Sequence, residues 1–339
     1  MLKGLRISIS LVVSLLVFSA CISSTAEDSA KSLVLYSGRS EELVAPLIEM
    51  FEEETGIEMQ VRYGNTAELA ATLMEEGPNS PADLFFAQDP GGLGAVAEAG
   101  LLAELPESIT GLVEPRFRSP DNLWVGVSGR ARVVVYNTEN VSIEELPDDL
   151  QGFTDPKWKG RIGLPPTNSS FQTMITAMRK VWGDPATAIW LRGIQANEPQ
   201  FYEKNTPTVA AVGAGEVDIG FVNHYYLLRF LAEEGEGFPA RNYFLPAGGP
   251  GSLVMAAGIG RLITSPNEAN ALRFIEFLLS QPAQEYFAAE TYEYPLVSGI
   301  APSEGLTPLN EMNTVDIDLA DLADLQGTII LLQDVGMLP

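Results

Sequence analysis

The sequence predicts an α/β protein of two lobes, each a mostly parallel sheet flanked by helices, with hinge strands joining them. Residues 33–86 alternate strand and helix patterns, residues 158–222 form a second α/β pattern, and a strongly β-prone run at 132–136 lies between them. The chain has 339 residues and 46% hydrophobic content, which is enough for two cores. We therefore expect a folded, two-lobed molecule.

The first lobe is predicted to begin with alternating strands and helices. In order, these are a buried strand at 33–36, a helix capped by Ser40 and ended by Gly56, an alternating strand at 57–63, a helix from 65 or 66 to 77, and a strand at 83–86. Such strands are parallel, and ligands bind beyond their carboxyl ends. Those ends are predicted at 36–40, 63–66 and 87–89.

The second lobe is predicted from a further set of elements. It contains a helix at 171–182, a helix around 209–213 and a buried strand at 217–222, and the small, apolar run 252–258 returns to the first lobe before helices at 267–280 and 282–290. We assign residues 31–130 plus 256–305 to the N-lobe and 131–255 plus 306–339 to the C-lobe. Two lobes joined by extended crossings favour a hinge, with a ligand held in the cleft.

The N-terminus reads as an export signal. Lys3 and Arg6 precede an apolar run, and small residues lead into Cys21, the only cysteine in the chain. We expect residues 1–20 to be a signal peptide, Cys21 to be lipidated, and 21–31 to be a tether. The alternative is cleavage near Ala26, which discards Cys21. The protein is thus expected on the outer face of the cell membrane as a lipoprotein, or in the periplasm.

Composition excludes several classes of function. With 45 acidic and 20 basic side chains the formal net charge is −25, so a nucleic-acid backbone would be repelled. The chain has no P-loop, no dinucleotide fingerprint and no Gly-x-Ser-x-Gly elbow, which argues against the common enzyme classes. A single cysteine and a single histidine, His224, cannot build a thiolate or imidazole metal site. We do not expect an enzyme.

Two adjacent tyrosines, Tyr225 and Tyr226, follow the buried run that ends at Val222, where a helix is expected to begin. A phenol has a pKa near 10, so it binds as a phenolate near neutral pH only when a strong Lewis acid stabilises the charge. Among metal ions, Fe(III) suits such hard oxygen ligands best. The pair therefore predicts a ferric site, and the alternative is an ordinary pair of core or surface tyrosines at the start of a helix.

Two further features suit an anion. The turn that ends in Ser169 and Ser170 runs directly into a helix, so its backbone N–H groups and hydroxyls would point at a ligand. Arg39 and Arg130 each lie beside glycine and serine at predicted strand ends, where a guanidinium group could hold an oxyanion with two hydrogen bonds. An ordinary helix cap is the alternative for the first feature.

With these residues placed, the chain resembles the ferric-iron-binding, periplasmic-type substrate-binding proteins of iron(III) ABC transporters, which are bacterial extracellular solute-binding proteins. The resemblance covers nearly the whole mature chain. It is carried by 35–39, 54–57, 81–86, 128–136, 156–160, 223–226 and 293–296. It implies a periplasmic-binding-protein-like fold, no catalysis, and iron bound by Tyr225 and Tyr226 as phenolates.

The resemblance also implies a group of residues that binds an anion, which we call the anion cradle. The cradle falls on Asn168, Ser169 and Ser170, with Asn205 and Asn223 nearby. The synergistic anion is expected to be carbonate or phosphate.

Three family ligands are replaced in this chain. Ser40 stands in place of a histidine, Gln88 in place of a carboxylate, and Phe171 in place of a third tyrosine. The candidates for the open coordination positions are Tyr63, Tyr202, Tyr36 and Asp89.

The expected function is capture of Fe(III) with an anion between the lobes and delivery to an ABC permease. The protein is expected to be a monomer that reaches the membrane through its lipid anchor. A binding protein for an organic or inorganic anion on the same scaffold is the first alternative. An extracellular enzyme with Tyr226 as acid or base is a remote one, because only His224 could assist it.

Overall fold

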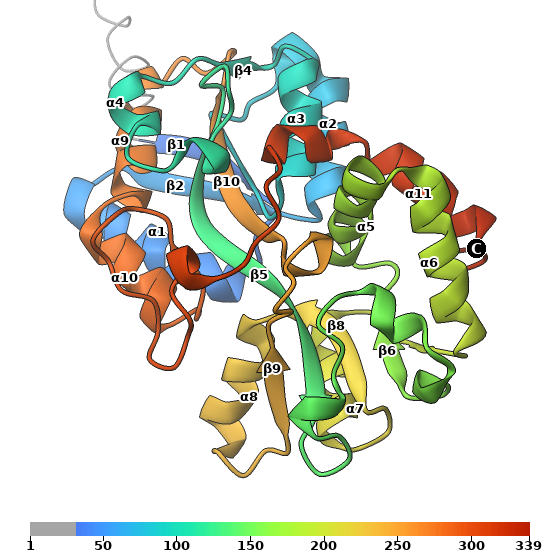
Figure 1. The fold of residues 1–339 in the computed structure, drawn as a ribbon. Coiled ribbons are helices and arrows are strands. Elements are labelled where there is room, and N and C mark those ends of the chain that lie inside the picture. Colours follow the sequence, from blue (N-terminus) through green and yellow to red (C-terminus); the bar gives the residue numbers. More distant parts are fainter. Residues whose placement is uncertain (1–31) are drawn as a thin grey trace, which may run out of the picture.

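The computed structural model describes residues 32–339, and it shows two lobes connected by long strands (Figure 1). The predicted signal peptide, the tether and Cys21 lie outside the described residues. The sheet is mixed. Its strand order is β2 (Glu58–Tyr63), β1 (Ser32–Ser37), β3 (Leu84–Ala87), β10 (Val254–Leu262), β5 (Val125–Asn137), β8 (Ile219–Asn223), β6 (Ile162–Leu164) and β7 (Gln200–Phe201). Within residues 32–339 no helix has the length and apolar character needed to cross a membrane.

The N-lobe begins with the predicted alternation of strands and helices. Its elements are β1 (Ser32–Ser37), α1 (Glu41–Thr55), β2 (Glu58–Tyr63), α2 (Thr66–Glu76), β3 (Leu84–Ala87), α3 (Pro90–Glu98), β4 (Leu102–Ala103) and α4 (Glu107–Thr110). Strand β1 pairs in parallel with both β2 and β3, as predicted. The carboxyl ends of the three strands therefore lie at one edge of the sheet.

Two long strands connect the lobes. These are β5 (Val125–Asn137) and β10 (Val254–Leu262), which run antiparallel with Val254 opposite Ala131. The far half of β5 pairs instead with β8 (Ile219–Asn223), with Arg132 opposite Asn223. One buried strand thus belongs to the sheets of both lobes, and it passes from the upper into the lower lobe (Figure 1).

The C-lobe continues with short strands and four helices. They are β6 (Ile162–Leu164), α5 (Ser169–Trp182), α6 (Asp184–Ala196), β7 (Gln200–Phe201), α7 (Asn205–Gly213), α8 (Tyr225–Glu234) and β9 (Ala240–Tyr243). Strand β6 pairs in parallel with β7 and β8, whereas β5 pairs antiparallel with β8 and β9. The antiparallel pairs of this lobe all involve the crossing strand.

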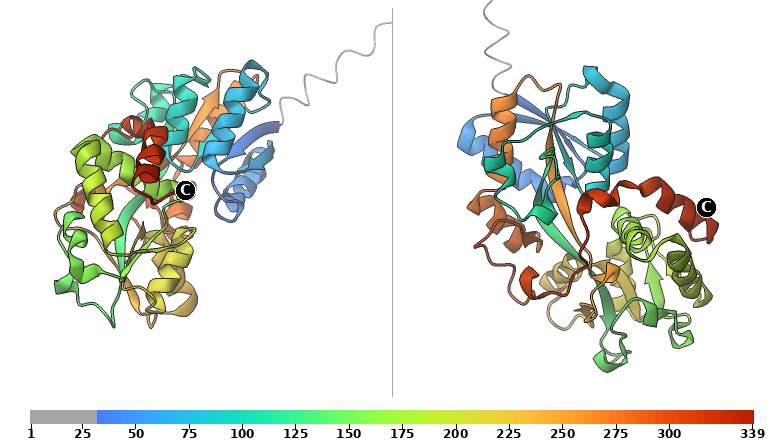
Figure 2. Two further views of the ribbon diagram at one scale, coloured as in Figure 1. Left: turned by 90° about the vertical axis from the view of Figure 1, so that its right-hand side faces the viewer. Right: turned by 45° about the horizontal axis from the view of Figure 1, so that its top comes forward.

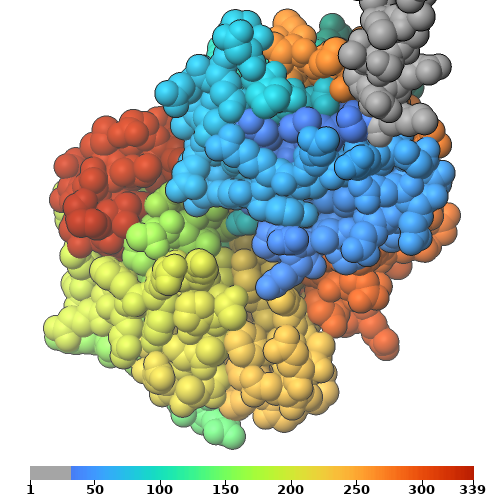
Figure 3. Space-filling view, turned by 180° about the vertical axis from the view of Figure 1, so that it is seen from behind, coloured from blue at the N-terminus to red at the C-terminus, as the bar shows by residue number. Residues whose placement is uncertain are grey.

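The last part of the chain contacts both lobes (Figure 2). It contains α9 (Glu268–Leu278), α10 (Gln281–Ala289), β11 (Tyr294–Pro295), the 3-10 turn η9 (Leu319–Ala323) and α11 (Leu325–Asp334). Leu319 and Leu322 pack in the N-lobe core, whereas Leu332 packs in a C-lobe core with Val335. The packing therefore agrees with the predicted C-lobe assignment of 306–339 only for α11. Seen from behind, the blue residues of the N-lobe lie directly above the yellow residues of the C-lobe (Figure 3).

Candidate functional site

Tyr225 and Tyr226 occupy the first turn of α8, directly after β8. The two rings stack with centroids 4.2 Å apart and planes inclined by 28°. Tyr225 is buried and Tyr226 is half-buried. Burial, followed by the neighbouring Tyr226, raises the pKa of Tyr225 well above its ordinary value, while Arg130 and Arg39 act in the opposite direction. Tyr225 is therefore a phenol unless a cation displaces its proton.

His224 is fixed by two backbone groups on either side of its ring. The N–H of Ala131 donates to Nδ1 at 3.1 Å, and Nε2 lies 2.8 Å from the carbonyl oxygen of Tyr292, to which it donates. Burial lowers the pKa of His224 to about 4. The imidazole is thus neutral with both nitrogens occupied, which makes it a support for the tyrosine pair and leaves no lone pair for a metal.

Three buried arginines lie near the tyrosine pair. Arg39 follows β1, whereas Arg130 and Arg132 belong to β5, and each is at most 1% exposed. Arg130 was expected at a strand end, but it lies inside β5, because that strand continues without a break between the lobes. The sequence alone could not reveal this continuity, since Gly126 and Gly129 resemble a strand terminus.

The two arginines predicted for the anion share one buried carboxylate. Nη2 of Arg39 donates to Oε2 of Glu293 at 2.7 Å, and Nε of Arg130 lies 3.8 Å from Oε1. Burial lowers the pKa of Arg39, but Glu293 and then Tyr225 raise it by more, so the net shift is upward. Nε and Nη1 of Arg39, and all three guanidinium nitrogens of Arg130, are buried without a hydrogen-bond partner. These groups can accommodate an oxyanion.

Arg132 has a neutral partner. Its Nη1 donates to Oδ1 of Asn223 at 2.9 Å, while Nε and Nη2 are buried and unpaired. Burial lowers the pKa of Arg132 to about 9, and Tyr226 acts in the opposite direction. A negative charge near Tyr226 would therefore stabilise this guanidinium.

The predicted anion cradle forms one hydrogen-bonded group. Asn168 caps α5 by accepting from the N–H groups of Ser170 and Phe171, and its Oδ1 also accepts from Nδ2 of Asn205 at 3.2 Å. Nδ2 of Asn223 donates to Oγ of Ser170 at 3.1 Å. Through Asn223 the cradle connects to Arg132, so the structure brings these predicted residues together.

Asp89 faces the cradle from the N-lobe. It precedes α3 and is 5% exposed, and its Oδ2 has no hydrogen-bond partner. Burial raises the pKa of its carboxyl, whereas Arg130, the N–H groups at the start of α3 and the hydroxyl of Ser169 lower it. Because Ser169 begins α5 of the C-lobe, Asp89 lies where the two lobes meet.

The other tyrosine candidates have partners elsewhere. Tyr36 donates to Glu76 at 2.9 Å on the N-lobe sheet. The hydroxyl of Tyr202 donates to Gln200 at 3.3 Å and lies near Glu216, and both of these residues belong to the C-lobe. Tyr63 is half-buried at the end of β2, near Glu41. Within residues 32–339, no hydrogen bond or ring contact joins any of the three to Tyr225 or Tyr226, although Tyr202 and Tyr226 pack against the same apolar cluster.

The three positions where family ligands are replaced also differ in surroundings. Ser40 is exposed at the start of α1, and Gln88 is half-buried between β3 and α3. Phe171 is fully buried in the apolar C-lobe core. Across residues 32–339 there is no group of three or more His, Cys, Asp or Glu side chains suited to a metal ion. Phenol oxygens are therefore the leading metal ligands that this site offers.

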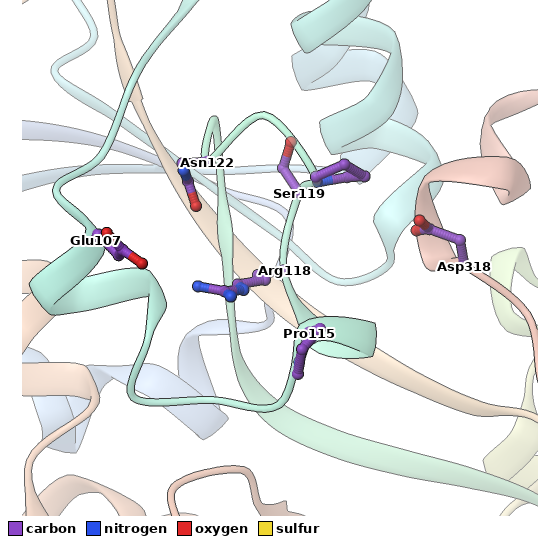
Figure 4. A pocket seen from close by; sticks show the side chains of 7 residues that line it. Glu107, Pro115, Arg118, Ser119, Asn122 and Asp318 are labelled. Carbon is purple, nitrogen blue, oxygen red and sulfur yellow. The ribbon is translucent and has the colours of Figure 1, made fainter.

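A separate pocket lies on the N-lobe side of the molecule (Figure 4). Its lining includes Glu107, Arg118 and Asn122 of the N-lobe together with Asp318 near the C-terminus. Nη1 of Arg118 donates to Thr110 at 3.2 Å. None of the predicted site residues lines this pocket.

Two site residues were missed in the sequence. Glu293 belongs to the segment 293–296, which carries the resemblance without suggesting a role at the site, and it lies 254 residues from Arg39 along the chain. Arg132 was read only as part of a β-prone run. The weak signal that could have revealed Arg132 is its alternation with Arg130, because residues two apart on a strand face the same side.

Comparison with known proteins agrees with this geometry. Residues 46–313 match the family model described as bacterial extracellular solute-binding protein. The Fe(3+)-binding periplasmic protein of Serratia marcescens is 31% identical over 338 residues, with 98% of this chain and 99% of the relative covered. The major ferric iron-binding protein of Neisseria meningitidis serogroup B is 32% identical, with 90% and 93% covered. A more distant relative from Salmonella typhi, 24% identical over 75% of this chain and 74% of the relative, is named a putative 2-aminoethylphosphonate-binding periplasmic protein.

Solved structures give the same result. Iron-bound HitA from Pseudomonas aeruginosa superposes with a TM-score of 0.85 at 32% identity, covering 90% of this chain and 99% of that one. The Trichodesmium protein IdiA, or FutA, in complex with iron and citrate superposes with a TM-score of 0.80 at 30% identity and the same coverage. The two-lobed α/β fold predicted from the sequence is confirmed.

Proposed function

Because the chain belongs to the bacterial extracellular solute-binding protein family, we propose that it binds Fe(III) with an anion between its lobes and delivers the iron to an ABC permease. Like the iron-binding proteins it resembles, it is a binding protein and not an enzyme. The observation that carries the proposal is the stacked pair Tyr225 and Tyr226 beside buried arginines with unpaired N–H groups.

The tyrosine pair supplies the metal ligands in this proposal. The two rings stack with centroids 4.2 Å apart, so one ion could contact both oxygens. A trivalent cation would also stabilise the phenolate of Tyr225, which burial disfavours. Asp89 is a further oxygen donor with a free Oδ2. Tyr63 and Tyr202 are not included among the ligands, since Tyr63 lies near Glu41 and the hydroxyl of Tyr202 donates to Gln200.

The anion is carbonate or phosphate in our proposal. Arg39 and Arg130 bind it through their free N–H groups, and the cradle of Asn168, Ser169, Ser170, Asn205 and Asn223 borders it. Such an anion fills coordination positions that the protein leaves open. It also offsets the charge of the buried guanidinium groups.

Transport follows from differential affinity. The closed lobes hold the iron, and opening at the membrane lowers the affinity, so that no covalent chemistry is needed. We propose that the protein is exported, that Cys21 carries a lipid anchor, and that a monomer docks on the permease. The lobe boundaries near residues 130 and 255 are supported by the separate cores on either side of β5 and β10.

A receptor for an oxyanion alone is the second candidate. It is favoured by the three buried arginines, whose unpaired N–H groups suit phosphate or a carboxylate without any metal. In that case the phenols of Tyr225 and Tyr226 would only donate hydrogen bonds. The same experiment separates the two candidates.

The test is the visible spectrum of the purified protein after addition of ferric citrate. Binding by phenolates predicts a strong charge-transfer band, which Tyr225→Phe or Tyr226→Phe weakens. The matched control is Tyr243→Phe in β9, which should leave the band unchanged. A colourless protein that still closes around phosphate would establish the second candidate instead.

A further inference from the structure

The carboxylate of Glu293 lies fully buried between the two arginines of the proposed anion site. It accepts from Nη2 of Arg39 at 2.7 Å, from Oγ of Ser128 at 3.0 Å and from Oγ1 of Thr291 at 3.3 Å. Nε of Arg130 lies 3.8 Å from its other oxygen, which accepts no hydrogen bond. One fixed anion of the protein therefore contacts the groups that would hold the bound anion.

The remaining N–H groups of both arginines are available to a ligand. Nε and Nη1 of Arg39 and Nη1 and Nη2 of Arg130 are buried without partners. Arg39 interacts electrostatically with Tyr225 and Tyr226 as well as with Glu293. An oxyanion beside the phenols and the carboxylate of Glu293 would thus share the same two guanidinium groups.

Arg132 provides the contrast within the same strand. Its partner is the neutral amide of Asn223 at 2.9 Å, so no carboxylate offsets its charge. Arg39 and Arg130, in comparison, are partly neutralised before any anion arrives. A neutral partner could have accepted the hydrogen bond of Arg39, and Arg130 makes no hydrogen bond to Glu293, so the charge of Glu293 is what it contributes to both arginines.

We propose that Glu293 is a resident counter-ion that competes with the bound oxyanion for Arg39 and Arg130 and so keeps the anion affinity low. The inference rests on the proposed anion site, and it identifies Glu293 as a residue that acts through the two arginines. Lower affinity for the anion lets the cargo leave when the lobes open. The carboxylate then serves as the counter-charge of the empty site.

The charge of Glu293 is expected to affect the affinity for the oxyanion more than its role in orienting the arginines does. Interactions between unit charges a few ångströms apart in a buried site exceed the loss from a single imperfect hydrogen bond. A glutamine at this position would still offer an oxygen to Nη2 of Arg39. It would remove the negative charge while keeping nearly the same shape, so the oxyanion would become the principal counter-charge.

The experiment measures phosphate binding by calorimetry on the purified protein without iron. Glu293→Gln is expected to bind inorganic phosphate at least about tenfold more tightly than the wild type. Glu290→Gln, an exposed carboxylate at the end of α10, is the matched control and should match the wild type. Equal or weaker binding by Glu293→Gln, or no phosphate binding by either protein, would overturn the proposal.

A second variant covers the case in which Glu293→Gln does not fold. Glu293→Asp keeps the charge but withdraws the carboxylate from Arg39 by one methylene, so its phosphate affinity should lie between those of the wild type and the glutamine variant. An aspartate variant that binds phosphate no more tightly than the wild type would contradict the proposal. Adding iron distinguishes the proposed iron-binding function from the proposed role of Glu293. A wild-type protein that stays colourless with iron would refute the first, whereas the phosphate affinities of the variants would still test the second.

Discussion

The two sides of the site are built from different kinds of groups. From the N-lobe and the crossing strand come charged side chains, namely Arg39, Arg130 and Glu293. From the C-lobe come neutral oxygen groups, of which Tyr225 and Tyr226 are the strongest metal ligands. A metal bound to the phenols and an anion bound to the arginines would therefore take ligands from both lobes, since Asp89 of the N-lobe and the C-lobe cradle lie at the same site.

Because of this difference, metal binding and anion binding are two linked equilibria that involve different side chains. In the proposed function, metal binding would displace protons from the C-lobe phenols, whereas anion binding would neutralise guanidinium groups of the N-lobe side. Each side can consequently be perturbed by its own variable, which is pH for the phenols and anion concentration for the arginines. The following predictions are arranged by the size of the expected effect.

Acid should weaken iron binding most strongly. Tyr225 is protonated in the empty site, because burial raises its pKa, and each phenol that binds iron as a phenolate loses a proton. The affinity for free Fe(III) should therefore fall as pH falls, by up to about 100-fold per pH unit when two protons are exchanged. Competition with a chelator of known pH dependence measures this slope. A pH-independent affinity would exclude phenolate ligands.

Removing the imidazole of His224 should destabilise the fold without altering the metal ligands. His224→Leu leaves the N–H of Ala131 and the carbonyl of Tyr292 without their partner, at a cost of about 2–4 kcal/mol in the free energy of unfolding. Urea unfolding measures the loss, and the maximum of the iron charge-transfer band should not move. A shifted maximum would mean that the histidine is itself a ligand.

Replacing Arg39 should affect the anion side more than the phenols, although the same change removes a charge that lowers the pKa of Tyr225. In Arg39→Gln the apparent affinity for phosphate in the presence of iron should fall about tenfold, since one charge-assisted donor pair is lost. At saturating phosphate the colour should return to the wild-type intensity. The double variant Arg39→Gln with Glu293→Gln controls for the buried carboxylate that the single change leaves without this partner. Permanent loss of colour would show that the two sides are not separable.

The smallest effect is expected at the outlying tyrosines. Tyr202→Phe and Tyr63→Phe should each change the iron affinity by less than about twofold, because the hydroxyl of Tyr202 donates to Gln200 and Tyr63 lies near Glu41. Chelator competition under one set of conditions is sufficient. A loss comparable to that of Tyr226→Phe would add the residue to the coordination shell.

Much of the fold follows from local patterns in the sequence. The alternation at 33–86 correctly predicts β1, α1, β2, α2 and β3, because period and capping residues are local signals. Helix α3 was missed because it begins Pro90-Gly91-Gly92, which reads as a loop. Helix α6 was missed behind Asp184-Pro185, although proline at the first turn is compatible with a helix.

The site was only partly predictable for a different reason. Tyr225 and Tyr226 are adjacent in sequence, so their joint role was visible, and the Ser169 turn carried a helix-start signal. Glu293 approaches Arg39 only through the tertiary fold. Its chemistry depends on that distance and on burial, neither of which is encoded in the neighbouring residues.

The most direct test of the account is an anomalous-scattering map of crystals of the iron-loaded protein. We predict one iron peak bonded to the hydroxyl oxygens of both Tyr225 and Tyr226, with an oxyanion between the metal and Arg39 or Arg130. An iron peak away from the tyrosine pair, or a site that contains only an oxyanion, would contradict the account.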